Sequence, residues 1–312
     1  MNKVTLFCLG LGLTSKKKYS VVDRLLGFLT LVPPIFWFLT PINAASAGVL
    51  SIGGYPPWDK CILGLLTVAL AGWGINTLNH YVDRERDKAI WPGRVIPTGR
   101  VKASSALASA VFLLICALLF SWFFFNPVNF LTLLLAIVLG SLYSAYLRDK
   151  VGYLSLPPIV GLIYLGGWAA FSPETLFSSL LPWYLYLLGV AWQAAHIMTY
   201  YPLHITYDIN GKPVMNTPAL FFTPSPQVAI GIGTGFVGLT LLLSVLLPLL
   251  APLSPLYLVL VLAAGVYALS SGLGLLRDTL NREKGLKAFA SLSIFRLTIS
   301  VAILLDIFVY CR

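Results

Sequence analysis

Asn79, Asp83 and Asp87 follow one another at intervals of four residues. On an α-helix this spacing places one amide and two carboxylates along a single face, one turn apart. Magnesium takes one or two protein carboxylates and completes its coordination with water and with the phosphate oxygens of a substrate. The row of side chains therefore predicts a site for a metal-bound diphosphate.

The same row has a second interpretation that involves no ligand. An acidic helix end can pair with neighbouring cations at a membrane surface, and this sequence supplies Arg84, Arg86 and Lys88 close by. The spacing of the three side chains is compatible with both interpretations. The choice between them depends on the elements that position these residues and on the segments that follow.

The composition excludes an ordinary soluble protein. The chain has 312 residues, of which 58% are hydrophobic and 10% are charged, and its mean hydropathy is +0.86. A soluble globular domain has about 25% charged residues. The high hydrophobicity also excludes a disordered chain, and four scattered cysteines exclude a disulfide scaffold. The composition indicates an integral membrane protein.

Nine apolar segments are long enough to cross a membrane, because a spanning helix needs about 20 apolar residues. We expect an all-α, multi-pass protein with spans at residues 25–50, 61–83, 103–124, 128–146, 153–172, 179–203, 226–250, 255–276 and 287–311. Residues 1–24 are expected to form an N-terminal cytoplasmic segment. Residues 25–312 are expected to form a single membrane domain, in the cell membrane if the source is prokaryotic.

Positive charge is distributed unevenly among the predicted loops. With the N-terminus inside, eighteen lysines and arginines fall in cytoplasmic segments and two, Lys60 and Arg312, in outer ones. Basic residues are retained on the cytoplasmic side, so this distribution favours an N-inside orientation. It also assigns the net charge of +10 to the membrane rather than to nucleic acid. The long polar connections 84–102 and 204–225 are both cytoplasmic, and we expect the chemistry on that side.

The segment that follows the first row carries a resemblance to a known family. Residues 94–100 read R-V-I-P-T-G-R and begin seven residues after Asp87. Together with the row at Asn79 they resemble the signature N-x-x-x-D-x-x-x-D and R-P-[IVL]-P-[ST]-G of UbiA-type intramembrane prenyltransferases, and the spacing is similar to that of the chlorophyll-synthase and hydroxybenzoate branches. Val95 replaces the usual proline, and His80 stands where many members have an acid. The resemblance covers nearly the whole chain and implies nine helices around a central chamber.

The second acidic motif of that family is expected at the inner end of the sixth span, where the match is poor. Three acids of hydroxybenzoate-type members fall by spacing on Ile197, His204 and Asp208, so only the aspartate is kept. Residues 192–196 are similar instead to the W-Q-x-P-H element of haem O synthases. A buried structural histidine is the alternative for both His196 and His204. For Asp208 we favour a functional role.

A third candidate element follows the fourth span. In the family a tyrosine and a basic residue of this loop help to hold the diphosphate, and Tyr143, Arg148 and Lys150 are similar in place, although the spacing is one residue short. Anchoring of the loop on the cytoplasmic side explains the two cations equally well. Arg296, within the ninth span, needs a partner because charge at membrane depth is costly. We expect a structural pair with Asp306 or a carbonyl group.

The resemblance implies Mg²⁺-dependent ionisation of an allylic diphosphate. The implied metal ligands are Asn79, Asp83, Asp87 and Asp208, and the three aspartates are the implied catalytic residues. The groups implied to bind the diphosphate are Asn79, Arg94, Tyr143, Arg148, Lys150, His204 and Lys212. The allylic cation is reactive toward water, so a dry chamber with aromatic walls is expected. Candidate wall residues are Trp73, Tyr81, Trp168, Tyr200 and Tyr207.

Three functions are compatible with these features. The first, which we favour, is transfer of a prenyl group from an isoprenoid diphosphate to a lipophilic acceptor, such as an aromatic quinone precursor or a tetrapyrrole, with the isoprenoid tail open to membrane lipid. The second is a terpene cyclase of the same family, which would quench the cation internally, and the altered second motif is compatible with it. The third is a transporter or structural membrane protein, for which no diphosphate release is expected.

Overall fold

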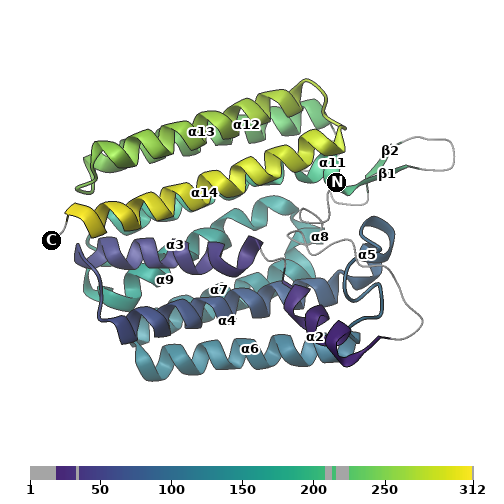
Figure 1. The fold of residues 1–312 in the computed structure, drawn as a ribbon, viewed down its shortest axis with the longest axis horizontal. Helices are drawn as coiled ribbons and strands as arrows, with labels where there is room; N and C mark the ends of the chain where they lie inside the picture. Colours follow the sequence, from purple (N-terminus) through teal and green to yellow (C-terminus); the bar gives the residue numbers. More distant parts are fainter. Residues whose placement is uncertain (1–18, 33–34, 208–212, 216–224, 311–312) are drawn as a thin grey trace.

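The computed structural model describes residues 19–32, 35–207, 213–215 and 225–310. Long helices lie side by side and run roughly along one direction (Figure 1). Seven of the described helical segments are long and apolar enough to cross a membrane. Their main helices are α4 (Trp58–Val82), α6 (Ala103–Phe124), α7 (Pro127–Leu142), α9 (Pro157–Phe171), α12 (Pro226–Leu246), α13 (Pro255–Leu276) and α14 (Arg282–Tyr310). Two more helices, α3 (Ile35–Ile52) and α10 (Leu181–Ile197), pack among them.

Short elements connect the long helices. Single turns of 3₁₀ helix lie at Tyr153–Ser155, Pro173–Thr175 and Leu247–Leu249. Proline is the first residue of α7, α9, α12 and α13, a position where its missing N–H costs nothing because that donor has no partner inside the helix. These prolines fix where the helices begin.

The surface of the bundle is apolar. On α6, large side chains are exposed along the whole helix, and these are Phe112, Ile115, Leu119, Trp122 and Phe123. A surface of this kind is unfavourable in water but contacts acyl chains in a bilayer, where backbone polar groups must be satisfied within helices. The protein is therefore an integral, multi-pass membrane protein.

The main core lies between α3, α9, α10, α12, α13 and α14. Its largest fully buried side chains include Tyr164, Tyr257, Phe295, Leu185 and Leu275. Polar contacts tie the helix ends to this core. The amide of Asn126 caps α7 and donates to the Ala169 carbonyl at 2.7 Å, which holds the α6–α7 turn against α9.

Asp306 has a similar role at the other side of the bundle. Its carboxylate accepts hydrogen bonds from the backbone N–H of Ser254, at 2.6 Å, and from the Ser254 hydroxyl, so it holds the residue that caps α13. Among the described residues it forms no ion pair with Arg296, which is ten residues away on the same helix, about 15 Å along the axis. The expected pair between Arg296 and Asp306 is therefore wrong.

Helices α3 and α9 approach each other closely at Gly167. A Cβ atom at this position would lie 2.1 Å from the carbonyl oxygen of Ala44 and 2.8 Å from its Cα. Small residues allow backbones of membrane helices to meet in this way. Because the clash would be with backbone atoms, no side-chain movement could relieve it, and the packing of α3 on α9 requires glycine at this residue.

Two predicted spans are interrupted in the structure. The first, 25–50, contains the end of α2 (Val21–Thr30) and most of α3. The Pro33-Pro34 pair between these helices lies outside the described residues, and a proline there can neither donate to a helical hydrogen bond nor favour a helical residue before it. The sixth, 179–203, is divided into α10 and α11 (Tyr200–His204). The backbone N–H groups of Met198 and Thr199 donate to the carbonyls of Ala195 and His196, three residues earlier, so the α-helical ladder ends there. Hydropathy alone does not show this change and placed the end of the span too late.

A two-stranded hairpin was also not expected. Strands β1 (Ile205–Tyr207) and β2 (Pro213–Met215) pair antiparallel, with Ile205 opposite Met215 and Tyr207 opposite Pro213. The strands are too short to show an alternation in the sequence. The hairpin projects from the end of the bundle that carries α11 and the charged helix α5 (Arg84–Ile90) (Figure 1). The body of the protein is helical, as predicted.

Candidate functional site

A cavity of about 360 Å³ lies among α3, α4, α7, α9, α10 and α14. Most of its wall is apolar, including Ile75, Leu133, Ile159 and Leu162. Ionisable side chains gather where α4 ends and α5 begins, at the end of the bundle that also carries α8 (Arg148–Lys150) and α11 (Figure 1). We call this polar end the mouth of the cavity.

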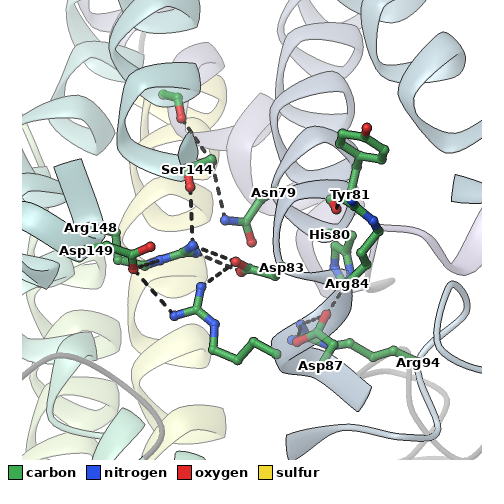
Figure 2. Close-up of polar contacts among 12 residues, drawn as sticks. Asn79, His80, Tyr81, Asp83, Arg84, Asp87, Arg94, Ser144, Arg148 and Asp149 are labelled. Atoms are coloured by element: carbon green, nitrogen blue, oxygen red, sulfur yellow. Dashed lines mark hydrogen bonds and ion pairs between the residues drawn. The ribbon is translucent and has the colours of Figure 1, made fainter. Parts of the chain in front are cut away.

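Asp83 and Asp87 line the mouth from one helical face, as their spacing predicted. Helix α4 ends at Val82, yet the backbone N–H of Asp87 donates to the Asp83 carbonyl at 2.8 Å, so the helical register continues into α5. The exposed fractions of the two residues are 8% and 3%. One turn earlier, the Asn79 amide donates to the Ser144 hydroxyl at 3.3 Å (Figure 2).

Two arginines engage the Asp83 carboxylate. The guanidinium of Arg148 donates through Nη1 and Nη2 to its two oxygens at 2.7 and 2.5 Å, and Arg86 also forms an ion pair with it (Figure 2). A forked pair of this kind is stronger and more directional than a single hydrogen bond. Arg86 and Arg148 also lie 3.7 and 3.5 Å from Asp149, which extends the charged cluster.

A π-helical turn brings Arg148 into the cavity. After α7, residues Tyr143–Leu147 form a π-helix, and the Arg148 backbone N–H donates to the Tyr143 carbonyl five residues earlier. Such turns occur within α-helices mostly as single insertions, often at functional sites. Here the wider turn places Tyr143, Ser144 and Arg148 on the cavity wall together. Arg148 is also held by the Ser144 carbonyl at 3.2 Å.

Asp87 is bound by one arginine. Arg94 Nη1 lies 2.7 Å from both carboxylate oxygens, and His80 Nδ1 is 4.0 Å from one of them. Burial raises the pKa of Asp87 above its usual value, although Arg94 opposes this effect. Arg94 therefore offsets the cost of burying this carboxylate only in part.

The start of α14 is anchored at the same end of the cavity. The guanidinium carbon atoms of Arg94 and Arg282 lie 5.7 and 4.6 Å from the centre of the Trp91 ring. A cation over an aromatic face is attracted by the ring quadrupole. Trp91 thus links the mouth of the cavity to the first residue of α14.

Residues 94–100 form a compact turn behind Asp87. Gly99 has a φ of +74°, which favours glycine, and the Thr98 carbonyl accepts a hydrogen bond from the Tyr19 hydroxyl at 2.7 Å. Val95, in the place of the usual proline, is buried against Leu31 and Val101. The substitution is accommodated because the side chain packs in a small apolar cluster.

The structure brings six of the predicted site residues to the cavity wall: Asn79, Asp83, Asp87, Arg94, Tyr143 and Arg148. Lys150 is exposed at the end of α8 and does not line the cavity. His204 ends α11, and its side chain is not described; Asp208 and Lys212 lie outside the described residues. The roles assigned to these side chains stay predictions.

The aromatic wall differs from the one expected. Trp73, Tyr81 and Trp168 do not line the cavity, and the Tyr81 ring instead lies against Arg84, 4.5 Å from its guanidinium carbon (Figure 2). Tyr200 and Tyr207 have side chains that are not described. The aromatic residues that do line it are Trp91, Tyr143, Tyr153, Trp192 and Phe289.

Sequence reasoning missed one contributor to the mouth, Ser144. It considered Arg86 as a partner of the acidic helix end, and the structure shows this pair with Asp83 three residues earlier on one helix. Ser144 gave no signal, because its contact with Asn79 joins residues 65 positions apart.

The oxygen ligands at the mouth suit a hard cation that binds together with the diphosphate of a substrate. Among the residues that the structure describes, no three His, Cys, Asp or Glu side chains form a group able to hold a metal by themselves. Asp83, Asp87 and Asn79 offer two carboxylates and an amide, and Mg²⁺ typically takes its remaining ligands from water and phosphate oxygens. The residues therefore fit a magnesium ion that binds together with a diphosphate.

The ion pair between Asp83 and Arg148 can be tested by a double-mutant cycle. We expect Arg148→Gln to lower the free energy of unfolding by about 3 kcal/mol, because the buried Asp83 carboxylate loses its forked pair and keeps Arg86 as its one charged partner among the described residues. The double variant Asp83→Asn, Arg148→Gln should lose less than the two single variants added together, since neither charge then remains. The measurement is unfolding in mixed micelles. Strict additivity of the two single effects would show that the pair does not form.

Carboxylates and arginines at the mouth of an apolar cavity, within a bundle of membrane helices, define an intramembrane functional site that suits a molecule with a charged head and an apolar chain. A model of the UbiA prenyltransferase family matches residues 19–297, and the chain belongs to this family of enzymes. Membership excludes the third function considered above, a transporter or structural protein.

Two curated relatives match over most of their length. A protoheme IX farnesyltransferase of Nitrosococcus oceani is 28% identical over 69% of this chain and 82% of its own. A 4-hydroxybenzoate octaprenyltransferase of Polynucleobacter necessarius is 28% identical over 86% of this chain and 88% of its own. These relatives act on different acceptors, so likeness to them identifies a prenyltransferase without identifying the acceptor.

Solved structures share the fold. A digeranylgeranylglyceryl phosphate synthase aligns with a TM-score of 0.65 and 20% identity over 91% of this chain and 99% of its own. A UbiA homolog from Archaeoglobus fulgidus, bound to GPP and Mg²⁺, aligns with a TM-score of 0.56 and 18% identity over 89% of this chain and 99% of its own. The membrane fold is therefore that of the UbiA homologues.

Proposed function

We propose that this protein transfers a prenyl group from an isoprenoid diphosphate to a lipophilic acceptor in a Mg²⁺-dependent reaction. The observation that carries the proposal is the cluster of two buried carboxylates and three arginines at the mouth of a cavity whose remaining wall is mostly apolar. The mouth would bind the diphosphate. The apolar part would hold the isoprenoid chain, which is hydrocarbon throughout.

Asp83 and Asp87 are the carboxylates that would hold Mg²⁺, with the Asn79 amide beside them and Asp208 as a further proposed ligand. Bound Mg²⁺ supplies Lewis-acid stabilisation of the departing diphosphate. The structural relative from Archaeoglobus fulgidus that was solved with GPP and Mg²⁺ supports this choice of metal.

The arginines of the mouth change partners in this proposal. Arg86, Arg94 and Arg148 are bound to Asp83 and Asp87 in the structure. Once the carboxylates are bound to a cation, the guanidinium groups become available to donate to phosphate oxygens, for which their forked geometry is well suited. They would then stabilise the negative charge that grows on the leaving group.

Four further groups complete the proposed diphosphate site. Tyr143 lines the cavity beside Arg148, 5.9 Å from ring centre to guanidinium carbon. Lys150, His204 and Lys212 are proposed to contribute from the surrounding loops. The aromatic side chains of the wall exclude water and offer ring faces to the allylic cation.

The orientation in the membrane follows from charge. We propose nine spans, with α3 and α10 added to the seven apolar segments, the N-terminus and residues 1–24 in the cytoplasm, and 25–312 as the membrane domain. The mouth would then face the cytoplasm, where the basic loops are retained. Water-borne diphosphates would reach the mouth from that side, and the acceptor would enter from the lipid.

The decisive experiment measures diphosphate release by purified protein. Geranyl, farnesyl and geranylgeranyl diphosphate are supplied with Mg²⁺ or EDTA, with and without aromatic and tetrapyrrole acceptors, and the lipid extract is analysed by mass spectrometry. We expect release that requires both Mg²⁺ and an acceptor, falls roughly 100-fold or more in EDTA, and gives a prenylated product. A cyclic product formed without acceptor would make the protein a terpene cyclase. No release from folded protein under any condition would overturn both the transferase and the cyclase.

A further inference from the structure

The cavity follows α4 and α7 inward from the mouth. The Asn79 amide on α4 donates to the hydroxyl of Ser144, which is 65 positions further along the chain. The same offset holds one turn deeper, where a Cβ atom at Gly140 would lie 3.2 Å from the Ile75 side chain. The two helices therefore run in the same direction, and each residue of α4 lies at the depth of the α7 residue whose number is 65 higher.

The deepest side chains of the cavity wall lie at one level. Thr67 is the first residue of α4 on this wall, and Thr132 of α7 lines it at the same depth. A Cβ atom at Gly166 of α9 would be 3.8 Å from the Thr132 methyl group, so α9 reaches this level as well. From Thr67 to Asn79 the helix advances twelve residues, about 18 Å along its axis. This is the depth of the cavity beyond the polar mouth.

Asn129 forms a polar floor at the deep end of the cavity. The residue is 8% exposed and lines the wall. Its Nδ2 donates to the Gly166 carbonyl at 2.9 Å, and its Oδ1 accepts a hydrogen bond from the Ser121 hydroxyl at 2.6 Å. The side chain thus ties α6, α7 and α9 together. Displacing it would leave buried polar groups without partners, which is costly, and a hydrocarbon chain offers them none. The floor is therefore a fixed end of the cavity.

The depth of the cavity can be compared with the length of an isoprenoid. Each isoprene unit adds four bonds to the main carbon chain, and an extended chain with ordinary carbon bond lengths and angles advances about 1.25 Å per bond. One unit therefore spans about 5 Å, so a depth of about 18 Å holds roughly three to four units. A chain of eight units would extend about 40 Å, more than twice the depth of the cavity.

We propose that the floor at Asn129 limits the donor to isoprenoid diphosphates of at most four isoprene units. The inference rests on the proposed function and deepens it, because it names the donor class for the same site. The diphosphate would lie at the mouth and the last isoprene unit against the floor. In this arrangement the chain ends inside the protein, in contrast to the tail open to membrane lipid that the sequence led us to expect.

Two alanines keep the passage to the floor open. Ala71 of α4 and Ala136 of α7 line the cavity at the same depth, 65 positions apart in the chain. This level lies eight residues beyond Asn79, about 12 Å along the axis. A large side chain here would leave the chain about 12 Å, enough for two isoprene units. The size of the residue at Ala136 therefore determines how much of the passage a donor can use.

Binding of thiolodiphosphate analogues tests the limit without turnover, because their carbon–sulfur bond resists ionisation. Geranyl, farnesyl, geranylgeranyl and octaprenyl analogues compete with a radiolabelled farnesyl analogue for the protein in nanodiscs with Mg²⁺, at equal mole fractions in the lipid. We expect the wild-type protein to bind the octaprenyl analogue about tenfold or more weakly than the geranylgeranyl analogue, because the longer chain does not fit. In Ala136→Phe the geranylgeranyl analogue should lose about tenfold or more in affinity relative to the geranyl analogue.

A matched control lies next to Ala136 on the same helix. Leu135 is 47% exposed on the outside of the bundle, and Leu135→Phe should keep the wild-type order of affinities. An octaprenyl analogue that binds as tightly as the geranylgeranyl analogue, or an unchanged order in Ala136→Phe, would overturn the length limit even if prenyl transfer is observed. Should Ala136→Phe not fold, the wild-type order and Ala136→Leu still decide. A length preference that shifts with Ala136 in a protein without transferase activity would leave the limit standing and overturn only the proposed function.

Discussion

Asp83→Asn is expected to lower Mg²⁺-dependent diphosphate release by roughly three orders of magnitude, and Asp87→Asn by a similar factor. Each substitution keeps the shape of the side chain and removes the charge that would hold the metal. Asp83→Asn also releases Arg86 and Arg148 from their buried partner. Turnover is therefore measured together with elution volume and thermal midpoint, so that loss of activity is read only from folded protein.

A matched control is present on the same helix. Asp59 lies exposed in the first turn of α4, at the end opposite the mouth, and Asp59→Asn should retain turnover close to that of the wild-type protein. Rates near wild type in both Asp83→Asn and Asp87→Asn would remove the metal site proposed for these carboxylates. A loss in Asp59→Asn as large as theirs would show that the assay reports general damage rather than metal binding.

Gly167→Ala is expected to have the largest effect on stability. The new Cβ atom would lie 2.1 Å from the Ala44 carbonyl oxygen, so α3 and α9 must separate. Overpacking typically costs about 1–3 kcal/mol where side chains can adjust, and here the obstacle is backbone. We expect a loss of at least about 3 kcal/mol in the free energy of unfolding, measured in mixed micelles.

The adjacent residue provides the comparison. A Cβ atom at Gly166 would meet only the Thr132 methyl group, at an ordinary 3.8 Å. Gly166→Ala should therefore be neutral, or stabilising by up to about 1 kcal/mol, because alanine is the better helix former. If both alanine variants unfold alike, the close contact of α3 with α9 does not exist as described.

Features that depend on one helix could be predicted from the sequence. The row Asn79, Asp83 and Asp87 was found because its spacing is a property of local helical geometry, and α4 continues into α5 in register. Most apolar segments were found for the same reason, since a long helix in lipid needs only its own hydrogen bonds. The end of α10 was misplaced because residues 198 and 199 differ little in hydropathy from those before them.

Features that join distant helices could not be predicted in this way. Arg148 was expected to bind a diphosphate, and the structure places it on Asp83, 65 residues away. Arg296 was expected to pair with Asp306 or a carbonyl group, but Asp306 accepts hydrogen bonds from Ser254, the residue that caps α13. Arg148 and Asp83 lie on different elements, and so do Asp306 and Ser254. Only the packing of those elements decides which groups meet.

The charges at the mouth cancel, and this has a consequence for the order in which ligands bind. Three arginines, Arg86, Arg94 and Arg148, lie among three carboxylates, Asp83, Asp87 and Asp149. A bare metal ion must displace cations from these carboxylates, and a bare diphosphate must displace carboxylates from these cations. Only the two together give every charge a new partner. We therefore expect Mg²⁺ and the prenyl diphosphate to bind synergistically, each raising the affinity of the mouth for the other by the same factor.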